Sequence, residues 1–183
     1  MPSWRDNFRS TPQIREEQLR LHRRTLPAAV AGSATLGLIL SLVLSQEVGA
    51  LPAWGWFVCL LASLAGRLWV FHWQDRQEPE QKNQHHWITR FRRAALVHGL
   101  VWAMASVLLF PAHNLTYQLF LVFALTGICV SALSGYSFDF KAALALCGPV
   151  LMAILLRMVM QGNETSAVIA LMLAMFMAYV MAI

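Results

Sequence analysis

Charge is scarce in this sequence. Asp, Glu, Lys and Arg make up 13% of its 183 residues, whereas 58% are apolar and the mean hydropathy is +0.54. Soluble domains carry roughly a quarter charged and about half apolar residues. Too few charged side chains are available to cover a surface exposed to water, so the composition indicates that most of the chain lies in lipid.

Cysteine and the common catalytic motifs are rare or missing. Cys59, Cys129 and Cys147 each lie inside an apolar run without metal-site spacing, so we expect three small buried side chains. The sequence contains no GxxxxGK[ST], GxGxxG, GxSxG or HExxH motif. No acidic residue lies inside an apolar run, because Asp139 is at the edge of one. We therefore expect no catalytic residue and no metal or cofactor site.

Six apolar runs are long enough to cross a membrane, which takes about 20 residues. Their approximate bounds are Leu26 to Ser45, Leu51 to His72, Ala94 to Phe110, Thr116 to Leu133, Phe140 to Met160 and Thr165 to Ile183. Four of the five connections are short, so consecutive helices should be antiparallel neighbours. The sequence predicts an all-α polytopic membrane protein with six transmembrane helices over 26–183, preceded by a basic segment at 1–25.

The basic residues predict the orientation of this bundle. All of the 14 Lys and Arg except Arg67 and Arg157 lie before the first run, in the second connection or beside the fourth. Basic residues accumulate on the cytoplasmic side, so both ends of the chain should be cytoplasmic. This distribution is explained by anionic lipid headgroups and requires no nucleic acid. We expect a multi-pass membrane protein.

The first 25 residues are too long for the basic part of a signal peptide. Thr11 is a good helix cap, Pro12 suits the first helical position, and Glu16 and Arg20 form an i,i+4 pair. We expect a short amphipathic helix here.

Polar residues inside the runs are the candidates for function. Arg67 lies about one turn from a cytoplasmic end and should extend to the headgroups. Arg157 lies toward the opposite side, where it could do the same, pair with Glu164 or Glu47, or contact an anionic ligand.

His98 and Trp102 share one helix face at i,i+4 spacing. A buried, hydrogen-bonded His98 is favoured over a haem ligand, for which His72 is the nearest second histidine.

Small residues indicate close helix packing. Ala170, Ala174, Ala178 and Ala182 form a stripe along the last run, which predicts a contact between two copies in a homodimer. Shorter sets occur in the first run (Ala29, Ser33, Gly37) and the fourth (Gly127, Ser131, Gly135). Pro149 should bend the fifth run.

From Phe91 to Ile183 the sequence resembles the N-terminal membrane regions of proteobacterial signalling proteins, in which a six-helix module precedes a GGDEF diguanylate cyclase domain, sometimes with an EAL domain, or a histidine kinase. The resemblance rests on "LFP" followed by "YQLFL", a fourth run rich in small residues, the central Pro149, and Arg157 shortly before "QGN". No GGDEF, EAL or kinase motif is present. The resemblance implies an output domain after Ile183, which would use GTP and Mg²⁺.

We therefore expect a sensory input and dimerisation module that controls its own cytoplasmic domain, with Arg157, Gln118, His98 and Trp102 as sensing candidates. The alternatives are the input module of a histidine kinase, a small self-contained transporter, and an electron-transfer subunit with haem on His98.

Overall fold

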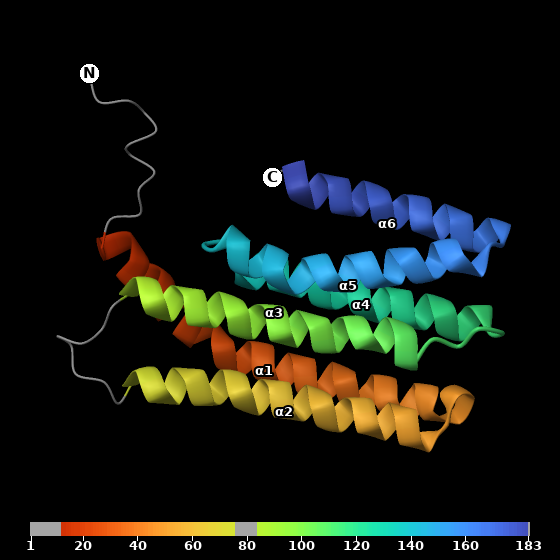
Figure 1. The fold of residues 1–183 in the computed structure, drawn as a ribbon, viewed down its shortest axis with the longest axis horizontal. Helices are drawn as coiled ribbons and strands as arrows, with labels where there is room; N and C mark the ends of the chain where they lie inside the picture. The colour runs from red at the N-terminus through yellow and green to blue at the C-terminus, as the bar shows by residue number, and fades with distance from the viewer. Residues whose placement is uncertain (1–11, 76–83, 183) are drawn as a thin grey trace.

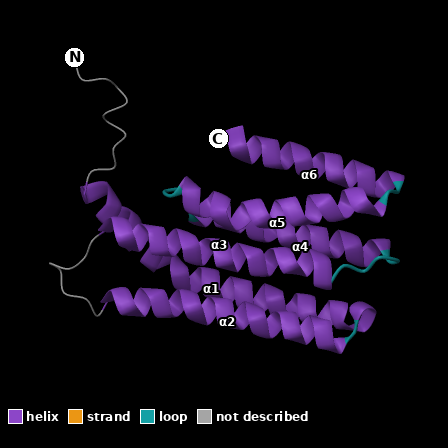
Figure 2. Ribbon diagram, in the orientation of Figure 1, coloured by secondary structure: helices purple, strands orange, loops and turns teal. Residues whose placement is uncertain are grey.

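The computed structural model describes residues 12–75 and 84–182, and this part of the chain forms six helices and no strand (Figure 2). The helices are α1 (Pro12–Val48), α2 (Ala50–Asp75), α3 (Gln84–Leu108), α4 (Leu115–Gly135), α5 (Phe140–Gln161) and α6 (Glu164–Ala182). They run up and down as one antiparallel bundle, with α2 at one edge and α6 at the other (Figure 1). The predicted all-α architecture is confirmed.

Five helices are long and apolar enough to cross a membrane. These segments are Arg24–Val48, Ala50–Trp73, Trp87–Leu108, Leu115–Gly135 and Phe140–Gln161. The helix composition is therefore that of a multi-pass membrane protein. The corresponding apolar part of α6, Glu164–Val180, is shorter. A sixth crossing stays a prediction.

The start of α1, the end of α2, the start of α3, the α4–α5 connection and the end of α6 all lie at one end of the bundle (Figure 1). Arg24, Arg92 and Lys141 lie toward this end, which we call the basic end. The α1–α2, α3–α4 and α5–α6 connections lie at the opposite end, so the prediction that consecutive helices run antiparallel is confirmed.

Two boundaries differ from expectation. α1 is continuous from Pro12 to Val48 with Pro27 inside it, so residues before 26 do not form a separate short helix. Thr11 and the side chain of Glu16 lie outside the described part of the chain. α3 begins at Gln84, nearly three turns before the predicted apolar run, because the "WITRFRR" segment continues the helix and is not part of a long loop.

The buried core includes side chains from all six helices, and α3 and α5 form its largest helix–helix contact. At Gly99 of α3, an added Cβ would lie 2.5 Å from the carbonyl oxygen of Leu146 and 2.8 Å from its Cα. The two backbones can approach this closely only because Gly99 has no side chain. Pro149 is accommodated inside a continuous α5.

Cys129 and Cys147 are buried in this core, as predicted. Cys59 is exposed on α2, so the expectation that it is buried is wrong.

Candidate functional site

A cavity of about 610 Å³ lies between α1 and α4, with α2, α3 and α5 behind it. Its volume is within the range of small-molecule sites, about 300–1,000 Å³. Small side chains from the two facing helices make its walls, among them Ala28, Gly32, Ser131 and Gly135. The cavity lining includes four members of the small-residue sets that were expected to bring helices together: Ala29, Ser33, Ser131 and Gly135. Here Ser131 and Gly135 instead leave space between α1 and α4.

Arg67 lies in the wall of this cavity and is only 6% exposed. Its Nη2 donates to the Tyr136 hydroxyl, and its guanidinium carbon lies 5.9 Å from the centre of the Tyr136 ring. The prediction that Arg67 extends to the headgroups is therefore wrong, because its face of α2 points to the bundle interior.

Arg67 forms no ion pair with any acidic residue whose side chain the structure describes. A buried charge without an ionic partner destabilises the fold by several kcal/mol. The position of Arg67 is therefore unfavourable unless an anion binds to it. Arg24 also lines the cavity, and its side chain is exposed.

His98 is buried at the floor of the cavity and joins three helices. Its Nδ1 lies 2.7 Å from the Ser63 hydroxyl, which itself donates to the Leu60 carbonyl at 2.7 Å. Its Nε2 lies 3.1 Å from both the Ser33 hydroxyl and Trp102 Nε1. This pattern assigns the neutral ring, with the proton on Nδ1 donated to Ser63 and Nε2 accepting.

The prediction of a buried, hydrogen-bonded His98 is thus confirmed. Both ring nitrogens are engaged, and the paired Ser63 lies nine residues before His72 on α2, which corresponds to about 13 Å along the helix. His72 is exposed and far from the level of His98, so these two residues do not form a pair of axial haem ligands. Among the described residues, no group of three or more His, Cys, Asp or Glu could hold a metal ion.

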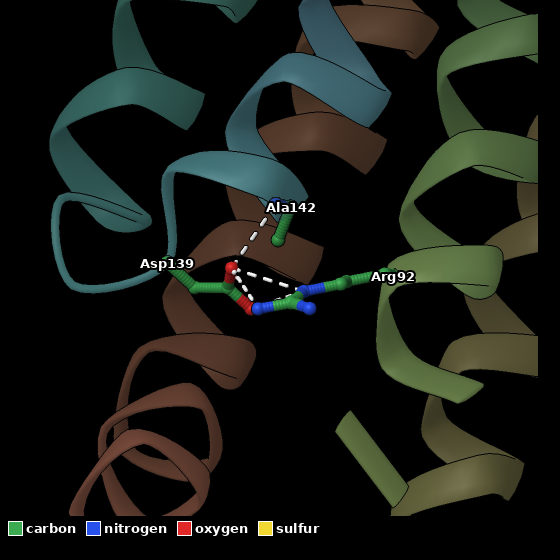
Figure 3. Close-up of polar contacts among 3 residues, drawn as sticks. All are labelled: Arg92, Asp139 and Ala142. Atoms are coloured by element: carbon green, nitrogen blue, oxygen red, sulfur yellow. Dashed lines mark hydrogen bonds and ion pairs between the residues drawn. The ribbon is translucent and has the colours of Figure 1, made fainter. Parts of the chain in front are cut away.

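Asp139 and Arg92 form an ion pair at the basic end, next to the cavity (Figure 3). Arg92 Nη2 lies 2.8 Å from Oδ1 of Asp139, and Arg92 Nε is 3.1 Å from both carboxylate oxygens. Asp139 also caps α5 by accepting from the Ala142 amide. Asp139 is buried, although the sequence pattern placed it only at the edge of a run.

Two arginines from different helices therefore hold one turn. Arg67 of α2 bonds Tyr136 at the end of α4, Arg92 of α3 bonds Asp139 at the start of α5, and the Asp139 amide donates to the Tyr136 carbonyl. We call residues 136–139 the clamped turn. It connects the cavity wall to the basic end of the bundle.

The other two predicted sensing residues lie at the opposite end. Gln118 donates to the carbonyls of Pro111 and Ala112, and Gln161 of α5 also donates to Ala112. The guanidinium carbon of Arg157 lies 4.6 Å from the centre of the Phe110 ring. Gln118 and Arg157 thus surround the α3–α4 connection.

Arg157 forms no ion pair with Glu164 or Glu47, both of which are exposed. Of the three alternatives for Arg157, the ion pair is therefore absent among the described residues. Glu47 instead accepts from the Asn114 side chain.

The alanine stripe lies partly inside the chain. Ala170 is buried, Ala174 is half-buried and Ala178 is exposed, while the side chain of Ala182 lies outside the described residues. Within the described residues, α6 packs chiefly against α5, and large side chains such as Met172 and Met175 are exposed along its other faces. The contact between two copies stays a prediction.

The sequence interpretation found His98 and Trp102 but missed Arg67 and Tyr136 as members of the same site. One signal was available, since Arg67 is one of two arginines that depart from the topological distribution of charge. A second hollow, of about 620 Å³ between α4 and α6, is lined by apolar side chains and two threonines and brings no charged group together. No known protein family, curated protein or solved structure matches the chain.

Proposed function

We propose that this chain is the membrane-embedded input and dimerisation module of a bacterial signalling protein, and that the cavity between α1 and α4 is where it receives its signal. The observation that carries the proposal is the buried Arg67, which faces a cavity of ligand size and bonds the clamped turn. The resemblance of residues 91–183 to the input regions of diguanylate cyclases supports a cyclase as the output domain, making cyclic di-GMP from GTP.

The route from ligand to output is short. A ligand that binds Arg67 competes with or reinforces its bond to Tyr136, and so changes the relative stability of two arrangements of the clamped turn. The turn begins α5, and α5 packs against α6. The end of α6 lies at the basic end (Figure 1). A shift of this helix would therefore move a domain attached there.

The proposed topology follows from the same arrangement. If α6 also crosses the bilayer, both chain ends lie on the side of the basic end, which the distribution of charge assigns to the cytoplasm. In a cyclase two catalytic domains must meet, so pairing of α6 with a second copy would set the output. The membrane would be the bacterial inner membrane.

The test compares Arg67→Gln with Arg93→Gln in the natural full-length gene product. Arg93 is exposed on α3 and does not line the cavity, so it controls for loss of a positive charge. At equal protein levels in cells, we expect Arg67→Gln to change cyclic di-GMP several-fold and Arg93→Gln to leave it unchanged. Equal cyclic di-GMP in both variants and the wild type, or a coding sequence with no output domain after Ile183, would contradict the proposal.

A further inference from the structure

We propose that the ligand of the cavity is an amphiphile with a single anionic head group, which binds Arg67 while its apolar tail lies between α1 and α4. The inference takes its signalling role from the function proposed above, but the binding itself can be measured without any output domain.

The charge balance of the site calls for an anion. Arg67 is buried, faces the cavity and forms no ion pair with an acidic residue of the described chain. Its guanidinium has five N–H donors, and the contact to Tyr136 uses only one of its nitrogens. A carboxylate or phosphate matches this planar fork with two parallel hydrogen bonds. Arg24 on the cavity wall adds a second positive charge and disfavours a cationic ligand.

The remaining walls suit an apolar tail. Leu36, Ile128 and Leu146 line the cavity beyond the charged groups, and the polar atoms of His98 are already bonded to Ser33, Ser63 and Trp102. From Arg24 to Leu36 the cavity follows about 18 Å of α1. A small free anion would leave most of this apolar space unfilled.

The depth of the charge agrees with an amphiphile in one leaflet. Arg67 lies six residues before Trp73, the end of its apolar segment, or about 9 Å inside it. Arg24 marks the corresponding end of the segment in α1. An anionic head near Arg67 would therefore lie just below the interface, with its tail directed toward the middle of the bilayer.

The test uses the whole 183-residue chain in a neutral maltoside detergent and four probes with the same tail: dodecanoate, dodecyl phosphate, dodecanol and dodecyltrimethylammonium. Dodecanoate and dodecyl phosphate should raise Tm by about 5–10 °C at a probe concentration near 100 times Kd. Arg67→Gln should weaken their binding about 10-fold or more, and Arg93→Gln should not. An equal shift with dodecanol, or an unchanged shift in Arg67→Gln, would overturn the proposal.

A second variant keeps Arg67 and removes the space. An added Cβ at Gly32 meets no atom within 4 Å, and Gly32 lines the cavity, so Gly32→Leu should fold and fill it. We expect Gly32→Leu to lose the response to dodecanoate while retaining its Tm without probe. A full response to dodecanoate in Gly32→Leu would place the binding elsewhere and overturn the proposal.

Mass spectrometry of lipids retained by the purified chain identifies the source of the anion. A bound phospholipid that is depleted in Arg67→Gln supports the proposal with the bilayer as the source, and a depleted free carboxylate supports it with a diffusible source. Equal retention of both in the wild type and in Arg67→Gln would count against it. If the probes bind as expected but Arg67→Gln leaves cyclic di-GMP unchanged, the proposed function fails while the binding site stands.

Discussion

At the scale of single residues, a few polar side chains join helices that are otherwise apolar on every face. His98 was recognisable in the sequence because a histidine deep in an apolar run must be bonded or solvated. The environment of Arg67 was not recognisable in the sequence, because a helix that is apolar all round does not reveal which face points inward. Ser33 was noted in the sequence only as a member of a small-residue set and Ser63 was not noted, so neither indicated a hydrogen bond to His98.

Replacing His98 tests the network at the floor of the cavity. His98→Ala leaves the hydroxyl of Ser33 and Nε1 of Trp102 with fewer partners and opens space in the core. We expect a loss of about 1–3 kcal/mol in the free energy of unfolding, measured by thermal unfolding in detergent. His113→Ala is the matched control, because His113 is exposed in the α3–α4 connection and should have almost no effect. Equal Tm values for the two variants would contradict the role of His98.

The Arg92–Asp139 pair tests the clamped turn. Arg92→Leu removes the ion-pair partner Arg92 from the buried Asp139 carboxylate. We expect a loss of about 1–3 kcal/mol in the free energy of unfolding, which is less than the roughly 3–5 kcal/mol for breaking a fully buried pair, because Arg92 is 31% exposed. Asp139→Asn should lower the free energy of unfolding less in the Arg92→Leu variant than in the wild type. Fully additive effects in the double-mutant cycle would mean that the pair does not couple α3 to the turn. Arg93→Leu is the control, because Arg93 is exposed.

At the scale of helices, the apolar runs and short connections were predictable because hydropathy and length are properties of each segment alone. The packing of the small residues could not be predicted from the sequence. Ser131 and Gly135 resemble a close-packing motif but line a cavity, whereas Gly99, which belongs to no such set, lies directly against the backbone of Leu146. Close packing depends on which helix lies opposite, and that information is absent from a single helix.

Substitution of two glycines separates these cases. Gly99→Ala places a Cβ 2.5 Å from a backbone atom of Leu146, so α3 and α5 must move apart; we expect a loss of about 1–3 kcal/mol. At Gly127 an added Cβ meets nothing within 4 Å, so Gly127→Ala should be neutral or stabilising by up to about 1 kcal/mol. Thermal unfolding of both variants decides, and a Gly99→Ala variant as stable as Gly127→Ala would refute the close contact.

At the scale of the whole molecule, α6 is the least integrated helix. Within the described residues it packs chiefly against α5 at the edge of the bundle (Figure 1), and many of its apolar side chains are exposed. The distribution of basic residues predicted the grouping of connections at the two ends of the bundle. It could not predict whether α6 contacts lipid or a second copy, because both are apolar.

The partner of α6 can be tested at the alanine stripe. Ala174→Leu together with Ala178→Leu adds bulk where a second helix would approach, and we expect weaker dimerisation and altered cyclic di-GMP in the full-length protein. Leu171→Ala, also exposed on α6, is a control outside the stripe. Unchanged dimerisation and unchanged output in the double variant would show that the stripe is not the contact.

The central claim is that binding of an anion in the cavity changes the clamped turn. Hydrogen exchange measures this change directly. With dodecanoate bound to the 183-residue chain, backbone amides of residues 136–143 should change their exchange rates severalfold, and Arg67→Gln should abolish the change at matched probe concentration. Binding of dodecanoate with unaltered exchange in this segment would contradict the account, because the cavity would then hold a ligand without any effect on the end of the bundle to which the proposed output domain would attach.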